Sequence, residues 1–374
     1  MGGATPNSIP YGVSVVASGA YRGTTLPLIQ ELPNTFDKLG VHQVAFVKVT
    51  PRISISRQVI GFVMLRSSAL IAIAILLLVS GCARQPSTGV TNLKPKTLPE
   101  LQQYLLNHRA DLDQFRLRGP YEVVTKKDFQ FSLSTAERIE ADLYLSAAAE
   151  KAPLIIFLHG QDNSKEDHAY QAMHVTTWGM HSLALHLPNN GPWVANGKTL
   201  ARIVELIYRR PEIIDKRIDV NKIILIGHSF GGSAVAIAVA EGAPAAGGIL
   251  LDPAGIGRDL PRYLNQITKP VMLIGADEQV SQTRNRDFFY RFIRSGISEV
   301  SIKDAVHEDA EYPAELQIQL FSIEPSATES LQITFVSALT SAAFSLATTG
   351  KFDYAWTSYG DAIKNGSMIN AKKK

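Results

Sequence analysis

The sequence predicts an α/β fold built on a mainly parallel, doubly wound sheet flanked by helices. Short apolar runs, typical of buried parallel strands, alternate with longer amphipathic or alanine-rich segments that are typical of helices. Reactive side chains stand just beyond several of these apolar runs, and an open α/β sheet gathers its chemistry at the carboxyl ends of its strands. The 374 residues, 45% hydrophobic and 19% charged, are enough for a large globular core.

The first expected strands form an antiparallel pair. Apolar and polar residues alternate along Phe129–Leu133 and Ile139–Leu145, which is the pattern of half-buried strands. The strands that follow are expected to be buried and parallel, and these are Pro153–Leu158, Ser182–Leu187, Ile223–Ile226, Gly248–Leu251, Val271–Ile274 and Val300–Lys303. The helices between them are expected at Asp167–Trp178, Thr199–Tyr208 and Ser233–Ala240.

The two ends of the domain are also predicted to be helical. Pro99–Arg109 fits a short amphipathic helix. Leu331–Thr348 is long and apolar, but its serines and threonines argue against a membrane span and favour a packed C-terminal helix. A further helix is predicted within residues 351–366, and the basic residues Lys372–Lys374 are predicted to form a frayed tail.

The stretch Gly227–Gly231 forms a G-x-S-x-G motif between an expected strand and an expected helix. A nucleophile elbow needs this context, because its glycines allow a sharp turn that holds a serine hydroxyl at the carboxyl end of the strand. We therefore expect Ser229 to be a nucleophile. A glycine-rich turn that leads into a helix is the structural alternative.

A serine hydroxyl is a weak nucleophile, so Ser229 requires a base and a carboxylate further along the chain. His307 follows the last expected strand, on a loop rich in acidic residues, and is the preferred base. A solvated loop histidine is the alternative for this position. His159 and His228 are expected to shape loops rather than to react.

Acyl transfer also requires two hydrogen-bond donors for the oxyanion. We expect these to be the backbone N–H groups of Phe230, the residue after the nucleophile, and of Gln161, in the loop after an expected strand. Trp193 lies in the expected loop Asn189–Gly197 at the same edge of the sheet, so it is the candidate for lining a substrate pocket.

Residues 121–350 resemble the α/β-hydrolases, through the motifs GHSFGG and LHG and through an aspartate directly after the strand GGILL. The order Ser…Asp…His is the one that this fold uses. Within this fold, these motifs are similar to those of the serine esterases of the platelet-activating-factor acetylhydrolase, chlorophyllase and polyester-hydrolase-like group. This resemblance implies an α/β-hydrolase fold and hydrolysis of small-molecule or lipid esters by a Ser-His-Asp triad, without a cofactor. The segment between Asp252 and Pro270 is too short for a large cap domain.

Two aspartates are candidates for the acid of the triad. Asp277 follows the next-to-last strand, which is the usual position in this fold. Asp252 follows the strand before it, as in the acetylhydrolase-like branch. Asp252 is preferred because it comes directly after its strand, which should point it towards the elbow, and because Pro253 biases its backbone to an extended conformation. Asp277 is kept as the alternative.

Residues 64–81 have the organisation of a secretory signal peptide. Arg66 supplies a basic start, and Ala69–Val79 is an apolar stretch shorter than the roughly 20 residues that span a bilayer. Cys82 directly follows small residues and resembles the lipidated cysteine of a bacterial lipobox. The resemblance implies a lipid-anchored protein of the bacterial cell envelope, and Ala83 favours the outer membrane. An ordinary signal or a buried helix is the alternative.

The segments around the signal are expected to lie outside the globular domain. Residues 1–63 show no sustained periodicity and no motif, so we expect translation to start at Met64 and the upstream part to be an overextended or unstructured N-terminus. Residues 82–120 are expected to be a tether with a short helix, and residues 351–374 a C-terminal helix with a basic tail.

Several classes of function are disfavoured. A net charge of +3 is too small to argue for nucleic-acid binding. The spacing of His168, His174, His181 and His186 matches no zinc pattern, so no metal is expected. The single cysteine allows no internal disulfide. Two classes remain, a lipid-anchored serine esterase and a non-catalytic envelope lipoprotein with a hydrolase fold. A thioesterase or a peptidase is the alternative within the enzymes.

Overall fold

The computed structural model describes residues 97–374, apart from 109, 149–150, 189, 191–192, 256, 278–284, 295 and 313–326. The expected signal at 64–81, the lipidation site Cys82 and the stretch 1–63 therefore lie outside the described residues. The strands are β1 Val123–Ser132, β2 Arg138–Ser146, β3 Ala152–Leu158, β4 His181–His186, β5 Ile218–His228, β6 Gly247–Leu251, β7 Val271–Ala276, β8 Ile297–Ile302 and β9 Met368–Lys373. The helices are α2 Leu98–Asn107, α3 Ala169–Thr177, α4 Trp193–Arg209, α5 Phe230–Ala240, α6 Leu260–Leu264, α7 Asn285–Phe292, α9 Ala327–Thr349, α10 Asp353–Ser358 and α11 Gly360–Lys364, with 3-10 turns η2 Leu112–Arg116, η3 Lys165–His168, η4 Pro211–Ile213 and η5 His307–Ala310.

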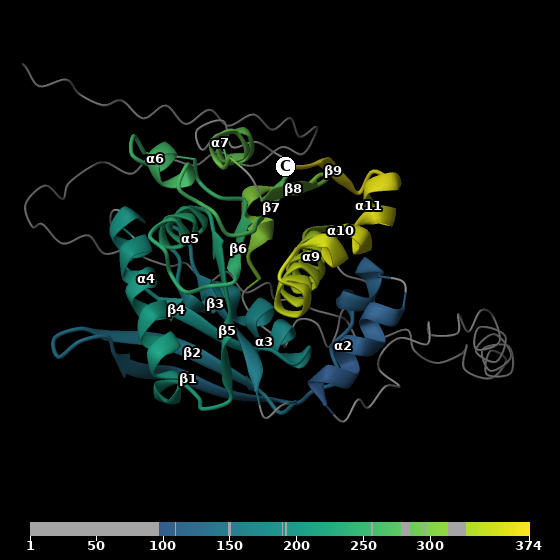
Figure 1. The fold of residues 1–374 in the computed structure, drawn as a ribbon. Coiled ribbons are helices and arrows are strands. Elements are labelled where there is room, and N and C mark those ends of the chain that lie inside the picture. Colours follow the sequence, from purple (N-terminus) through teal and green to yellow (C-terminus); the bar gives the residue numbers. More distant parts are fainter. Residues whose placement is uncertain are drawn as a thin grey trace, which may run out of the picture. The chain divides into compact units, whose positions relative to one another are not determined.

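The strands form one sheet of nine in the order β1-β2-β4-β3-β5-β6-β7-β8-β9 (Figure 1). The strands from β4 to β8 in this order pair in parallel, and antiparallel pairs occur at both edges, in β1–β2, β2–β4 and β8–β9. Every residue of β3 and of β6 is buried, as expected for parallel strands that are covered on both faces. The predicted α/β fold with a mainly parallel sheet is confirmed.

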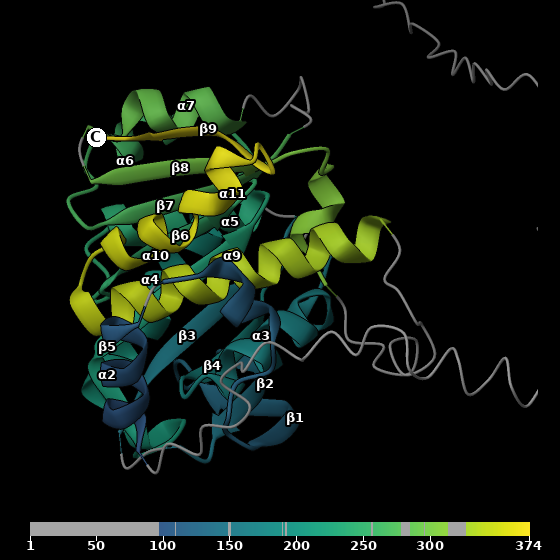
Figure 2. The ribbon, with the colours of Figure 1, turned by 90° about the vertical axis from the view of Figure 1, so that its right-hand side faces the viewer.

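Helices cover both faces of the sheet. On one face α2, α3, α9 and α10 pack into a core that includes Trp178 and Phe344. On the other face α4, α5, α6 and α7 pack into a second core. Figure 2 looks onto the first of these layers, with α9 lying across the sheet. The chain thus places a helix layer on each side of the buried strands, and the carboxyl ends of those strands are free to carry loops.

Helix α9 is the most apolar long element of the described part of the chain. By length and composition its residues Thr328–Thr349 could cross a membrane, and no other described helix passes that test. Its most apolar window is 72% buried within the fold, however, which is typical of a core helix. The hydroxyls of Ser337 and Thr340 donate to the carbonyls of Ile333 and Val336, one turn earlier, so these polar side chains are satisfied inside the core.

Two predictions about the ends of elements are wrong. The stretch Asn189–Gly197 was expected to be a loop, but α4 begins at Trp193. Gly197 is accepted inside this helix because the helix packs closely on α5, where a Cβ at Gly197 would come within 2.6 Å of the Ile237 side chain. The stretch 351–366 contains two short helices, α10 and α11, in place of one.

The basic tail is the second correction at the chain end. Lys372 and Lys373 belong to β9, which pairs with β8 and closes that edge of the sheet. Lys372 lies 3.3 Å from the buried carboxylate of Glu299 and 3.4 Å from Asp287, so the sheet gives its charge two partners. Lysines are also suited to an edge strand, because they disfavour pairing with further chains.

Candidate active site

The elbow predicted around Ser229 is present at the end of β5. Ser229 has φ 53° and ψ −123°, a strained conformation for a residue with a Cβ. Its backbone N–H donates to the carbonyl of Leu251 at 3.0 Å, which holds the turn against β6. Gly227 and Gly231 are required here, because a Cβ on either would collide with the backbone of the turn or of β3. The strain is characteristic of a serine held for reaction at the top of a strand.

His307 is placed at the start of η5, where its ring meets Asp252. Nδ1 of His307 lies 2.5 Å from Oδ2 of Asp252, and the Asp252 side chain is fully buried. Oδ1 of the same carboxylate accepts the backbone N–H of Ala276 at 3.0 Å. Burial lowers the pKa of His307, but the hydrogen bond to Asp252 and its charge outweigh that effect and raise the pKa. The contact orients the ring and favours its charged form.

The alternative acid, Asp277, has a different place. Its carboxylate accepts the backbone N–H of Asp304 at 3.1 Å, and its own N–H donates to the carbonyl of Ala305 at 3.0 Å. Both contacts hold the turn between β8 and His307. The structure therefore brings Asp252, of the two aspartates, to Nδ1 of His307, while Asp277 supports the loop that carries the histidine. The extended backbone expected for Asp252 is wrong, because its φ is 36°, in the left-handed region.

Of the two expected oxyanion donors, Phe230 directly follows Ser229 in the chain, and Gln161 lies in the loop after β3. Phe230 is the first residue of α5, and the N–H groups of a helix's first turn have no acceptor within the helix. Gln161 follows Gly160, whose Cα faces the serine so closely that an added Cβ would lie 3.1 Å from the Cβ of Ser229. The loop after β3 is therefore placed next to the elbow, and Gly160 is a position that sequence reasoning overlooked.

Trp193, the expected pocket residue, contacts the residue after the nucleophile. Its ring stacks on that of Phe230, with 5.1 Å between the ring centres and an angle of 19° between the planes. Trp193 is 8% exposed. The stacked pair is formed by the first residues of α4 and α5, and one of its members, Phe230, is the residue after Ser229.

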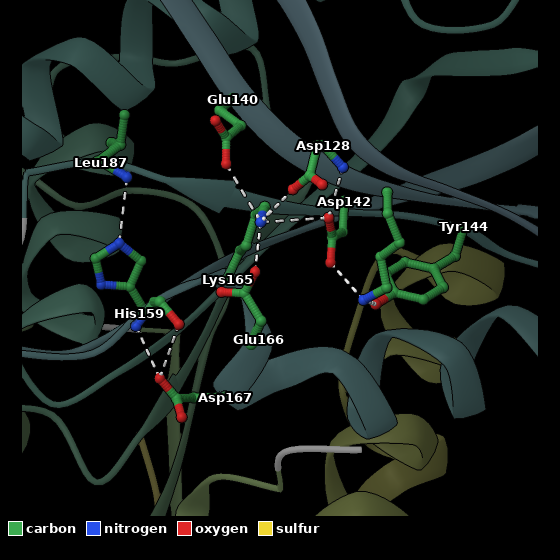
Figure 3. Close-up of polar contacts among 11 residues, drawn as sticks. Asp128, Glu140, Asp142, Tyr144, His159, Lys165, Glu166, Asp167 and Leu187 are labelled. Carbon is green, nitrogen blue, oxygen red and sulfur yellow. Dashed lines mark hydrogen bonds and ion pairs between the residues drawn. The ribbon is translucent and has the colours of Figure 1, made fainter. Parts of the chain in front are cut away.

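The remaining predicted histidines are held by the fold. Nε2 of His159 accepts the backbone N–H of Leu187 at 3.2 Å, a contact that ties the end of β3 to the end of β4 (Figure 3). His174 bonds the carbonyl of Phe115 through Nε2, and burial lowers its pKa to about 4. Within the described residues no group of three or more His, Cys, Asp or Glu side chains has the arrangement of a metal site.

Sequence reasoning also missed Glu311 and its partner Asn163. Glu311 follows η5 and accepts hydrogen bonds from Asn163 and, at 2.6 Å, from Nδ1 of His228. The acidic composition of the stretch after His307 was the available signal, but it does not distinguish Glu311 from its neighbours Glu308 and Asp309.

A buried lysine in η3 helps to hold the segment that follows β3. Nζ of Lys165, in η3, is 2.9 Å from Asp128, 3.3 Å from Glu140 and 3.6 Å from Asp142, and it also contacts Glu166 (Figure 3). The Lys165 side chain is only 5% exposed. Burial alone would lower its pKa, but the surrounding carboxylates outweigh that effect and raise it. We call these five residues the Lys165 cluster, and it joins η3 to the β1–β2 pair.

The assembled geometry has the parts that acyl transfer needs. A strained serine, a histidine paired with a buried carboxylate and a close loop with backbone donors lie at one edge of the sheet. A family model described as "Alpha/beta hydrolase family" matches residues 155–356, which is more than half of the 374 residues. This span begins in β3 and includes the elbow, Asp252 and η5. No curated protein matches the chain.

Proposed function

The chain belongs to the alpha/beta hydrolase family, and from this premise we propose that it is a serine hydrolase that cleaves carboxylic esters through an acyl-enzyme. The family supports a hydrolase of a general kind. The observation that carries the finer proposal is the contact of 2.5 Å between His307 and the buried Asp252, on a loop beside the strained Ser229.

In the first half of the reaction, the Oγ of Ser229 attacks the ester carbonyl carbon while the other ring nitrogen of His307, Nε2, takes the hydroxyl proton. A tetrahedral intermediate forms, and its oxyanion is stabilised by the N–H groups of Phe230 and Gln161. The carbon–oxygen bond to the leaving group then breaks, and His307 returns the proton to the departing alcohol. Asp252 keeps the ring in the required tautomer and stabilises its charged form.

In the second half, water replaces the alcohol as nucleophile. His307 takes a proton from the water as its oxygen attacks the acyl carbon, and the bond to Ser229 breaks as the serine recovers its proton. The products are a carboxylic acid and the free enzyme. No cofactor takes part in this scheme.

The substrate class proposed is a small-molecule or lipid ester. This class is favoured by the resemblance to the platelet-activating-factor acetylhydrolase, chlorophyllase and polyester-hydrolase-like esterases. It is also favoured by the stacked aromatic rings of Trp193 and Phe230, the latter being the residue after Ser229. We also propose that the protein is located in the bacterial cell envelope and carries a lipid anchor at Cys82. Both proposals rest on the lipobox-like sequence.

The experiment that tests the proposal uses a fluorophosphonate probe and p-nitrophenyl acetate. We expect the probe to label Ser229, located by peptide mass analysis, and we expect Ser229→Ala to lose about a millionfold in turnover while keeping its melting temperature. Activity of the variant within tenfold of the wild type would contradict the assignment of Ser229. Absence of labelling from pH 6 to 9 would favour a non-catalytic envelope protein, and cleavage of thioesters or peptides in preference to esters would favour the other enzyme alternatives.

A further inference from the structure

Glu311 joins three segments of the candidate site. It is 9% exposed and follows η5, the turn that carries His307. One of its carboxylate oxygens, Oε1, accepts from the side-chain amide of Asn163, on the loop of the expected oxyanion donor, and from Nδ1 of His228, on the elbow. Glu311 follows the turn that carries His307. Its single oxygen Oε1 therefore connects that turn both to the loop after β3, which we call the oxyanion loop, and to the elbow.

His228 completes the connection. Its Nε2 lies 3.1 Å from the backbone carbonyl oxygen of His307, while its Nδ1 faces Glu311 at 2.6 Å. A carboxylate can only accept hydrogen bonds, so Nδ1 of His228 is the donor in its contact with Glu311. The other titratable groups that face this ring are His307, with 4.4 Å between ring centres, and His168, with 6.5 Å.

The charge of Glu311 is suited to this role. Burial raises the pKa of the Glu311 carboxyl, but the hydrogen bond and the charge of His228, aided by Asn163, outweigh it and lower the pKa to about 2. Glu311 is therefore ionised throughout the range in which an esterase works. A charged carboxylate therefore lies against the ring of His228, the residue before Ser229.

The side chains of His228 and Asn163 lie close to Ser229, around Gly160. A Cβ on Gly160 would lie 3.1 Å from the Cβ of Ser229, 3.3 Å from Nδ1 of His228 and 3.6 Å from Nδ2 of Asn163. These atoms thus surround one point of the oxyanion loop. Asn163 is two residues after Gln161, so a shift of Asn163 would also move the loop that carries Gly160 and Gln161 relative to Ser229.

We propose that Glu311 is a positioning residue, which through His228 and Asn163 sets the distance of both the His307 loop and the oxyanion loop from Ser229. This proposal rests on the proposed function, since it assigns Glu311 a part in the same acyl transfer. Glu311 acts only through other residues. It sets the geometry of the transition state, in which base and oxyanion donors must act together, and it adds nothing to substrate affinity.

Other contacts keep the same segments folded when Glu311 is changed. The backbone N–H of Tyr312 donates to the carbonyl of Asp167 at 2.9 Å, and the side-chain amide of Gln171 donates to the carbonyl of Ala310 at 2.9 Å. A Glu311 variant is therefore expected to keep its fold and to shift the two loops locally.

The test compares Glu311→Gln with Glu299→Gln, measuring kcat and KM for p-nitrophenyl acetate, the rate of fluorophosphonate labelling and the melting temperature. Glu299 is a matched control, because it is a fully buried carboxylate with a lysine partner, on β8 away from the elbow. For Glu311→Gln we expect kcat and the labelling rate to fall about 10- to 100-fold with KM within twofold of wild type. For Glu299→Gln we expect a lower melting temperature and unchanged kcat.

A double variant and a spectrum separate positioning from mere stabilisation. If His228 acts through Glu311, Glu311→Gln combined with His228→Gln should lose no more kcat than the worse single variant. Proton NMR of the wild type should show a strongly hydrogen-bonded Nδ1–H signal for His228, and Glu311→Gln should shift or lose that signal. A kcat within twofold of wild type in Glu311→Gln, additive losses in the double variant, or a His228 Nδ1–H signal that is unchanged in Glu311→Gln would each overturn the proposal.

Failure of this inference is distinguishable from failure of the proposed function. If the wild type labels at Ser229 and hydrolyses esters while Glu311→Gln does so equally well, the role of Glu311 is wrong and the esterase stands. If the wild type itself neither labels nor hydrolyses, the esterase is wrong, and the role of Glu311, which depends on it, is overturned as well.

Discussion

Asp252 is held by two contacts that leave its carboxylate little freedom. One oxygen accepts the N–H of Ala276 and the other meets Nδ1 of His307 at 2.5 Å. We expect Asp252→Asn to lose about four orders of magnitude in turnover with its fold retained, because an amide favours the wrong tautomer of the histidine. Steady-state hydrolysis of p-nitrophenyl acetate and a thermal melt measure the two effects.

Asp277→Asn is the matched control for that experiment. Asp277 supports the turn before His307 through the N–H of Asp304, and an amide oxygen can accept the same hydrogen bond. We expect turnover within a few-fold of wild type. A crippled Asp277→Asn beside an active Asp252→Asn would show that the acid occupies the usual position of the fold.

The raised pKa of His307 fixes the direction of the pH dependence. The base must be neutral to accept a proton, so kcat/KM should fall as the pH drops through this pKa, which lies above the ordinary value of 6.5. The midpoint of the acidic limb is therefore expected above pH 6.5. In Asp252→Asn the charge of Asp252, which raises the pKa of His307, is lost while burial still lowers it, so an NMR titration of His307 should give a lower pKa than in the wild type. A limb that is at or below pH 6.5 in the wild type would contradict the assignment of His307 as the base.

At the scale of elements, the Lys165 cluster is predicted to contribute to the stability of η3 and of the loop before it. Lys165→Met would leave the fully buried Asp142 with Lys127 as its remaining cationic partner, at 2.5 Å. We expect the free energy of unfolding to fall, by up to about 3 kcal/mol, since the buried carboxylate of Asp142 loses one of its two cationic partners. Urea denaturation measures the change.

Lys198→Met is the control for the cluster. Its side chain is 54% exposed and lies 3.9 Å from Glu241, a separation and exposure typical of surface pairs. Such pairs contribute less than about 1 kcal/mol, so little change is expected. Equal losses in the two variants would show that burial of Lys165 brings no special stability.

Some elements of this fold are determined by local sequence and others by tertiary packing. The buried strands and the positions of Ser229, Asp252 and His307 just beyond them could be predicted, because apolar runs and glycines act locally. The start of α4 at Trp193 and the pairing of β9 could not, since they depend on close packing with α5 and on the carboxylate of Glu299. Glu311 was missed for the same reason, because its partners come from the loop after β3 and from the end of β5.

At the scale of the whole molecule, the proposed anchor determines where the enzyme works. If Cys82 is lipidated, Cys82→Ser should leave a mature protein that no longer sediments with membranes. The first described helix, α2, begins at Leu98, and the candidate site lies later in the chain, so catalysis by the released protein should be unchanged. Fractionation of cells followed by immunodetection measures the distribution. A Cys82→Ser variant that still sediments with membranes in its mature form would rule out the lipid anchor.

If the chain is exported before it folds, as the proposed signal and anchor imply, helix α9 has a consequence for its passage. In that case the segment Thr328–Thr349 would cross the export channel without the partners that bury it in the finished domain, and its apolar character would resemble a stop signal for that channel. Ser337 and Thr340 lower that character while the chain is in transit. After folding, their hydroxyls return to carbonyls one turn earlier, at 2.7 Å and 2.6 Å, so the polarity that favours passage adds little strain to the mature core.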